Sequence, residues 1–405
     1  MRTPHLVAGA LAVSLLGMGA VAFNAFAQYF EGKYVHAVAG VDHTELNNGN
    51  ALERVALSQE DLLPIYGASE LVLLETEYQA NQFFSTYPTG FMVFNIASKG
   101  GSSLTTAQKL AALGDDVRGK KVIISIGPAI MTMAPYGEVN VRHYNGNFSP
   151  LNALEMAFSP HLSMDTRRRV ARRMLDFPES LEDHPFIRFT LENLANLSPL
   201  HRLAYEASKP LGWIQILILR LQDHYNTVNF IRHLSSAQTT IIRKDREIDW
   251  ESFVPIAEKE QIENTDSNPY GVDNSQWPKI KELFLSPIPP GSKDEEFRED
   301  VENAREWHDL DLALRVIHDL DADAIIMSSP MNVPLWETIG VSKDAQQAYY
   351  AKLHSVVAPY ELTVVDFRQF DSEPYFSMDL ASHASRKGWI YVNQTLDEIF
   401  HGDLP

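Results

Sequence analysis

The chain of 405 residues contains no cysteine. This absence excludes disulfide bridges, thiol nucleophiles and zinc sites built from thiolates. Basic residues are also scarce, because 34 lysines and arginines stand against 53 aspartates and glutamates and leave a net charge of −19. Nucleic-acid partners need a basic surface, so the composition argues against them. No glycine-rich phosphate loop follows a predicted strand, and no cofactor or metal site is indicated.

One long uncharged run stands at the start of the chain. Residues 6–23 read LVAGALAVSLLGMGAVAF, and with the next residues to Ala27 the run has about the 20 positions that a helix needs to cross a membrane. An uncleaved anchor, with its short Arg2-bearing side in the cytoplasm, is one interpretation. Cleavage of a signal segment after Ala27, at AFA, is the other. Both place residues 28–405 outside the cytoplasm, and the anchor predicts a single-pass protein of the cell membrane.

Short apolar runs recur from Leu62 onward, and they predict five strands. The runs are 62–66, 91–97, 120–127, 323–329 and 361–367. Each is nearly continuous rather than alternating, which is typical of strands buried on both faces of a parallel sheet. Helical spacing in 102–113, 343–356 and 385–401 predicts helices between and after these strands. The sequence therefore predicts a three-layer, mostly parallel α/β sheet whose ligands lie beyond the carboxyl ends of the strands.

The predicted core is interrupted by a helical insertion. Residues 150–310 have helical spacing and no strand pairs, so the insertion falls between the third and fourth strands. The predicted divisions are an anchor or signal segment at 1–27, a juxtamembrane stalk at 28–60, the first half of the core at 61–149, the insertion at 150–310 and the second half of the core at 311–405.

A cluster of arginines lies within the insertion of this acidic chain, at positions 167, 168, 169, 172 and 173. A solvated helix face is one interpretation. The other is a surface that meets anionic lipid headgroups or a polyanionic acceptor, where each basic residue adds about 1 kcal/mol. Composition alone leaves both open.

The stretch PIYGASE, residues 64–70, places a serine directly after the first predicted strand. Ser69 precedes a helical segment, so its hydroxyl should lie at a helix N-terminus. There the amide dipoles favour negative charge on a nucleophile or an oxyanion. A helix-capping serine is the alternative interpretation, and it is the commoner role at such a junction.

A serine nucleophile needs a base, and His383 is the histidine whose position suits that role. It lies between the last predicted strand and the C-terminal helix, in a loop that should emerge at the same sheet edge as Ser69. Asp379, four residues earlier, is suited to hold the imidazole in the tautomer that accepts a proton. A capping aspartate followed by a surface histidine is the alternative.

Several segments together resemble the D-alanyl-lipoteichoic acid biosynthesis protein DltD family. They are PIYGASE (64–70), KGGSSL (99–104), GKKVIISIGP (119–128), FSP (148–150) and PYF followed by Asp379, His383 and KGW (374–389). The resemblance covers both ends of the predicted core in order. Through 150–310 it extends only to the general helical character.

This resemblance implies a single-span membrane protein of the SGNH-hydrolase-like class with a serine triad. Carried over by position, Ser69 is the nucleophile, His383 the base and Asp379 its orienting carboxylate. The amides of Ser69 and Gly100 then form the oxyanion hole. Glu70 and Trp389 are further candidates for substrate contact, although the simplest interpretation of Trp389 is that its indole packs on the core.

The partners are likewise implied by the resemblance. They are a membrane-bound O-acyltransferase and a D-alanyl carrier protein, with lipoteichoic acid or a similar anionic cell-surface polymer as acceptor. An envelope esterase or thioesterase of the same fold is an alternative function. A non-catalytic adaptor for the carrier and the transferase is another.

The sequence departs from the family pattern at two places. Three residues separate Asp379 from His383 where the family usually has two, so we expect the local turn to bulge. This extra residue is the one feature that favours an adaptor. Residues 127–130 read GPAI where the family has an SPQW-like end of the third strand, which predicts different contacts to the acceptor or the acyl group.

Overall fold

The computed structural model of the protein contains a five-stranded parallel sheet. It describes residues 3–74, 76–132, 137–196, 198–234, 247–286, 288–381 and 383–402, and of residues 3–4 and 137–140 the backbone only. The strand order is β2-β1-β3-β4-β5, and every neighbouring pair is parallel. The strands are β1 (Leu62–Gly67), β2 (Met92–Ala97), β3 (Lys121–Ile126), β4 (Asp323–Ser328) and β5 (Thr363–Asp366). The predicted parallel α/β sheet is thereby confirmed.

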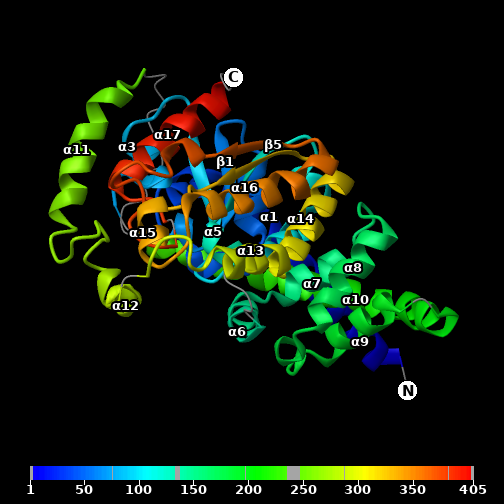
Figure 1. Ribbon diagram of the computed structural model, residues 1–405. Helices are drawn as coiled ribbons and strands as arrows, with labels where there is room; N and C mark the ends of the chain where they lie inside the picture. The colour runs from blue at the N-terminus through cyan, green and yellow to red at the C-terminus, as the bar shows by residue number, and fades with distance from the viewer. Residues whose placement is uncertain are drawn as a thin grey trace.

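The sheet separates two hydrophobic cores, because successive side chains of a strand point to opposite faces. The larger core includes Tyr66, Phe94 and Ile124, and the smaller includes Ile65, Val93 and Ile123. Helices α4 (Ser103–Leu113), α14 (Glu306–Leu320) and α16 (Lys343–Val357) cover the first face. Helices α3 (Ala80–Thr86), α11 (Trp250–Glu263) and α17 (Arg386–His401) cover the second, which gives three layers (Figure 1).

Helices fill the chain between β3 and β4 in the part that the structure describes. They are α5 (Pro128–Thr132), α6 (Gly137–Asn147), α7 (Pro150–Phe158), α8 (Met164–Leu175), α9 (Pro185–Ala195), α10 (Pro199–His233), α11, α12 (Trp277–Ile280), α13 (Asp294–Asn303) and α14. A further short helix, α15 (Val333–Thr338), follows β4. Helices α7 to α10 form a lobe beside the sheet (Figure 1). The helical character predicted for this region is therefore present, while its domain boundaries stay a prediction.

Helix α1 (Thr3–Ala39) continues from the apolar run into the folded domain. Its most apolar 18-residue window has a mean hydropathy of 2.2 and is not buried, so the helix is long and apolar enough to cross a membrane. The second half of α1 is different, because Ala27, Val35 and Val38 are fully buried. Residues 28–60, predicted as a stalk, thus pack against the sheet domain, and α2 (Ala51–Leu57) adds Leu52 to the same core.

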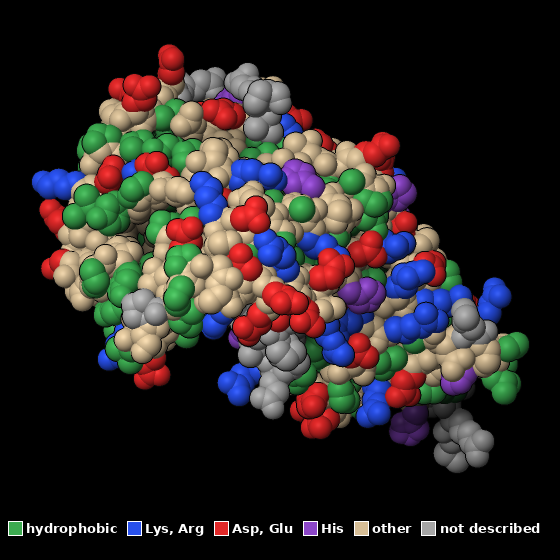
Figure 2. Space-filling view, in the orientation of Figure 1, with side chains coloured by type: hydrophobic (Ala, Val, Ile, Leu, Met, Phe, Trp, Pro, Cys, Tyr) green, Lys and Arg blue, Asp and Glu red, His purple; other side chains and the backbone are tan. Residues whose placement is uncertain are grey.

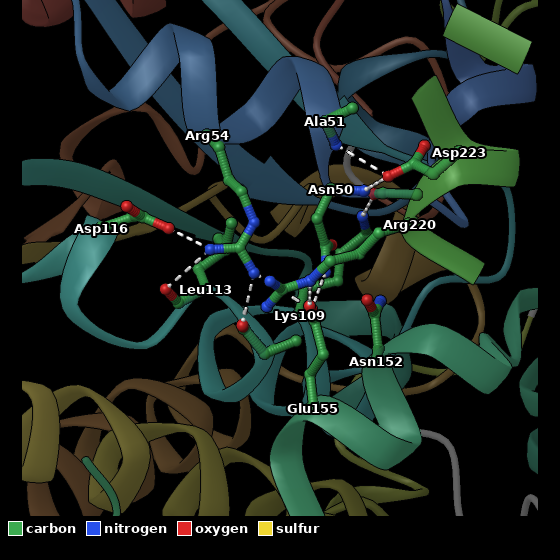
Figure 3. A network of polar contacts seen from close by, with 12 residues as sticks. Asn50, Ala51, Arg54, Lys109, Leu113, Asp116, Asn152, Glu155, Arg220 and Asp223 are labelled. Carbon is green, nitrogen blue, oxygen red and sulfur yellow. Dashed lines mark hydrogen bonds and ion pairs between the residues drawn. The ribbon is translucent and has the colours of Figure 1, made fainter. Parts of the chain in front are cut away.

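A polar network fastens this N-terminal segment to the insertion (Figure 3). Asp223 of α10 accepts the backbone amides of Asn50 and Ala51 at 2.7 and 2.9 Å, and thereby caps the N-terminus of α2. Glu155 of α7 accepts hydrogen bonds from the side chains of Asn50 (2.8 Å) and Arg54 (3.1 Å). These partners lie about a hundred or more residues apart along the chain, so local sequence patterns do not reveal the network.

Arg173 of the arginine cluster is an internal residue. Its guanidinium donates to both carboxylate oxygens of Asp309, at 2.7 and 3.0 Å, and its side chain is only 6% exposed. This bidentate pair joins α8 to α14. Arg169 also pairs with a carboxylate, that of Asp165 at 2.6 Å, but its side chain is 44% exposed.

Replacing Arg173 by alanine should lower the free energy of unfolding by about 3–5 kcal/mol, because the Asp309 carboxylate would stay buried without its partner. Arg169→Ala is the matched control and should cost no more than about 1 kcal/mol, as is usual for an exposed pair. Denaturant unfolding of the full chain in detergent measures both values. Equal losses in the two variants would contradict the structural role assigned to Arg173.

Candidate catalytic site

Ser69 lies at the carboxyl end of β1, at the start of a short 3₁₀ turn (Ser69–Leu71). The turn is tight at Gly67, where an added Cβ would lie 2.5 Å from Glu70 Oε1 and 2.7 Å from Leu71 Cδ1. The backbone amide of Ala68 donates to the Glu70 carboxylate at 2.8 Å. Glycine and a carboxylate on either side of the serine thus set the backbone that presents its hydroxyl.

The serine hydroxyl meets an imidazole from the far end of the chain. Ser69 Oγ lies 2.9 Å from His383 Nε2, although 314 positions separate the two residues. Nδ1 of the same ring lies 2.6 Å from Asp379 Oδ2. The second carboxylate oxygen, Oδ1, accepts the backbone amide of His383 at 3.2 Å. Asp379 therefore fixes both the ring and the backbone of His383, and leaves Nε2 facing the serine.

The extra residue between Asp379 and His383 is taken up by a turn. The amide of Met378 donates to the carbonyl of His383 at 2.8 Å, and Ser377 and Ala384 form an antiparallel bridge. The chain therefore folds back on itself between 378 and 383. The additional position lengthens this turn without parting the carboxylate from the imidazole. Ser382, within the turn, lies outside the described residues.

Opposing effects act on the pKa of His383. Burial disfavours the imidazolium and lowers the pKa, whereas the charge and hydrogen bond of Asp379, together with the charge of Glu70, raise it. The net result is a pKa above the ordinary value of 6.5. The ring is thus a stronger base than a free histidine, which suits removal of a proton from a hydroxyl.

The loop after β2 brings Gly100 to the same site. Its φ is +74°, and an added Cβ would lie 2.7 Å from the ring of His143, so both conformation and space favour glycine. Gly100 and Ser69 line one cavity. Among the described residues, neither backbone amide donates a hydrogen bond to another protein group. Two such donors at one rim are what an oxyanion requires.

The cavity has a volume of about 330 Å³ and opens at the carboxyl ends of β1, β2 and β3. Its polar wall carries Ser69, His383 and the loop of Gly100. Its apolar wall comes from the end of β3 and from α5, with the side chains of Ile124, Ile126, Ala129, Ile130 and Met131. Ala129 and Ile130 belong to GPAI, so this departure from the family pattern falls in the cavity wall.

Of the two residues predicted to contact substrate, only Glu70 lines the cavity. Burial raises the pKa of its carboxyl, and the amide of Ala68 opposes that shift. Trp389, on α17, is 2% exposed and packs in the smaller core. Three polar residues outside the quoted segments, Thr106, His143 and Glu306, also line the cavity, as does Ser125 of GKKVIISIGP. The segments of these three residues carry no quoted motif, and the packing of α4, α6 and α14 brings them to the cavity.

Three arginines of α8, of which Arg173 is buried and the other two are exposed, line a second hollow. Arg169, Arg172 and Arg173 of α8 line a surface hollow of about 440 Å³ together with Asp176, Arg305 and His308. Figure 2 shows lysine and arginine side chains concentrated over α8. Binding of an anionic polymer or lipid headgroup at this hollow stays a prediction.

The comparisons with known proteins agree on one family. The family model described as DltD protein matches residues 42–401. Protein DltD of Bacillus subtilis (strain 168) is 25% identical over 359 residues, which cover 87% of this chain and 86% of the relative. Protein DltD of Staphylococcus aureus (strain NCTC 8325 / PS 47) is 23% identical over 404 residues, which cover 99% and 96%. The chain belongs to the DltD protein family.

Proposed function

We propose that the protein is an extracytoplasmic, serine-dependent acyltransferase that places D-alanyl groups on hydroxyls of a cell-envelope polymer, lipoteichoic acid or a similar polyanion. The observation that carries this proposal is the continuous contact from Ser69 Oγ through the His383 ring to the Asp379 carboxylate, at 2.9 and 2.6 Å. Membership of the DltD family supports the choice of acyl group and acceptor. The SGNH-hydrolase-like class belongs to the same proposal.

The reaction begins with attack of Ser69 Oγ on the carbonyl carbon of an ester or thioester. His383 Nε2 takes the hydroxyl proton, and Asp379 stabilises the resulting imidazolium. The amides of Ser69 and Gly100 donate to the oxyanion, and one such donor typically lowers the barrier by about 3–4 kcal/mol. Collapse breaks the bond to the leaving alcohol or thiol, which receives the proton from His383 and leaves an acyl-Ser69 ester.

The second half of the reaction reverses these roles. His383 removes a proton from the acceptor hydroxyl, whose oxygen attacks the acyl-Ser69 carbonyl. The ester bond to the serine breaks, Ser69 recovers its proton from the imidazolium, and the acyl group leaves on the polymer. Water in place of the polymer hydroxyl would give an esterase or thioesterase from the same residues.

The proposed site works beside a membrane. Helix α1 continues without a break through Ala27, which is fully buried, and this supports an uncleaved single-pass anchor. An anchor holds the domain beside membrane-borne partners, which we propose to be a membrane-bound O-acyltransferase and a D-alanyl carrier protein. The lengthened turn before His383 had favoured an adaptor without catalysis. Because that turn keeps the Asp379–His383 contact, the catalytic function is the better supported of the two.

A serine-directed fluorophosphonate probe tests the proposal on the full chain in detergent. Activated serines react with such probes, so we expect one phosphonyl group on the tryptic peptide that contains Ser69, located by mass spectrometry. The same protein unfolded in urea is the control and should stay unlabelled, because unfolding separates Ser69 from His383. A folded chain that resists the probe, or that is labelled at another serine, would contradict the proposed nucleophile.

A further inference from the structure

One carboxyl group in the wall of the cavity has no part in the proposed mechanism. Glu306 is the first residue of α14 and is 2% exposed. Its Oε1 accepts the backbone amide of Ser103 at 2.5 Å, and so contacts the loop that also carries Gly100. Its other oxygen, Oε2, has no hydrogen-bond partner among the described residues. A buried carboxyl oxygen without a partner is costly, and a ligand that donates to it would remove that cost.

The charged groups around the cavity favour a cation as that ligand. The described residues that line it include two glutamates and two histidines, but no lysine or arginine. Glu70 already accepts the amide of Ala68, whereas Oε2 of Glu306 meets no donor in the part of the chain that the structure describes. Burial, followed by the charge of Asp309, raises the pKa of Glu306 to about 8. An ammonium group within this poorly solvated space would favour the carboxylate and pair with it strongly.

The rest of the wall limits what else the ligand carries. Ile124, Ile126 and Met131 offer apolar surface for a small alkyl group. Glu306 contacts the end of the Gly100 loop through the amide of Ser103, and Ser69 lines the same cavity. An acyl group that carries an amine next to its carbonyl therefore finds a partner for the amine in Glu306 and a partner for the carbonyl in Ser69.

We propose that Glu306 receives the ammonium of an aminoacyl group while Ser69 attacks the carbonyl of that group, so that the cavity selects charged aminoacyl donors over uncharged acyl donors. The inference rests on the proposed function, because it assigns a specificity-determining residue to the same site. Each aminoacyl group held in this way turns its carbonyl toward the amides of Ser69 and Gly100 and its alkyl side chain toward the β3 wall.

A pair of donors that differ by one amino group tests this inference. D-alanyl and propionyl thioesters of N-acetylcysteamine are supplied to the full chain in detergent, and acylation of Ser69 is followed by mass spectrometry and by thiol release. The wild-type chain should prefer the D-alanyl donor by about 10- to 100-fold in kcat/KM, the range expected for a hydrogen bond to a charged group. Glu306→Gln keeps the acceptor for Ser103 but loses the charge, and should reduce this preference by about the same factor.

Glu302→Gln is the matched control, because Glu302 lies on the outer side of α13 with its side chain 68% exposed. Its preference should equal that of the wild type. Equal rates of acylation by the two donors in the wild-type chain would overturn the role of Glu306 and leave the proposed function standing. This comparison uses the wild-type chain alone, so it does not depend on whether a variant folds. Acylation by neither donor would overturn the proposed function and this inference with it.

Discussion

Ser69→Ala should reduce acyl transfer by about 10⁴-fold or more. The substitution removes Oγ, the atom that forms the acyl-enzyme, and leaves His383 without a hydroxyl to deprotonate. Only the backbone amides of Ser69 and Gly100 and the binding of substrate would then contribute to the rate. The measurement is the amount of ester-linked D-alanine on the envelope of cells whose only copy of the protein is the variant, with trapping of radiolabelled acyl-protein as the second readout.

Ser98→Ala is the control for this experiment. Ser98 follows β2 at the same edge of the sheet, but its hydroxyl donates to Asn147 rather than to His383. Its loss should leave esterification near the wild-type level, and both variants should reach the membrane in equal amounts. Normal esterification in Ser69→Ala cells would exclude the nucleophile and favour an adaptor. Release of free D-alanine from isolated envelope by the wild-type protein would favour an esterase.

The sheet and the meeting of Ser69 with His383 were predictable because few physical rules govern them. Runs such as 92–97 and 121–126 are buried on both faces, so they are nearly continuously apolar and stand out against the helices. The carboxyl ends of parallel strands share an edge, so the loops after the first and last strands emerge at that edge. Because β3 and β4 lie between β1 and β5, the contact across 314 positions also depends on the segment after β5, which carries His383 back to the end of β1.

Other features depended on packing partners that local patterns do not encode. The sequence pattern placed Glu31 in a predicted polar stalk. In the structure Glu31 is fully buried, and its Oε1 lies 2.7 Å from Nδ1 of His224 on α10. Glu306 stood in an acidic stretch without a motif, and only the docking of α14 against α4 brings it to the cavity. Two interpretations were open for Trp389, packing of its indole on the core and contact with substrate, and its indole lies in the smaller core. A sequence gives the type of a polar or aromatic residue, but its role depends on which distant helix covers it.

Asp379→Asn should lower kcat by about 10³- to 10⁴-fold while the fold stays intact. An asparagine amide in place of Asp379 Oδ2 would present an N–H to His383 Nδ1 and favour the wrong tautomer, in which Nε2 carries the proton. Asp366→Asn is the matched control. Asp366 also holds a histidine, with His354 Nε2 2.7 Å from its Oδ2, but neither residue lines the cavity. Its acyl-transfer rate should stay within about twofold of the wild type.

The pH profile separates this role from a structural one. Only the neutral imidazole accepts the serine proton, so kcat/KM should rise with pH through the pKa of His383, which lies above 6.5 in the wild-type chain. Loss of the Asp379 charge removes the main influence that opposes burial, and the pKa must then fall. The acidic limb of the kcat/KM profile of Asp379→Asn should therefore move to lower pH, while the maximum value of kcat/KM falls. An unmoved limb, or a shift to higher pH, would show that Asp379 does not act on the base.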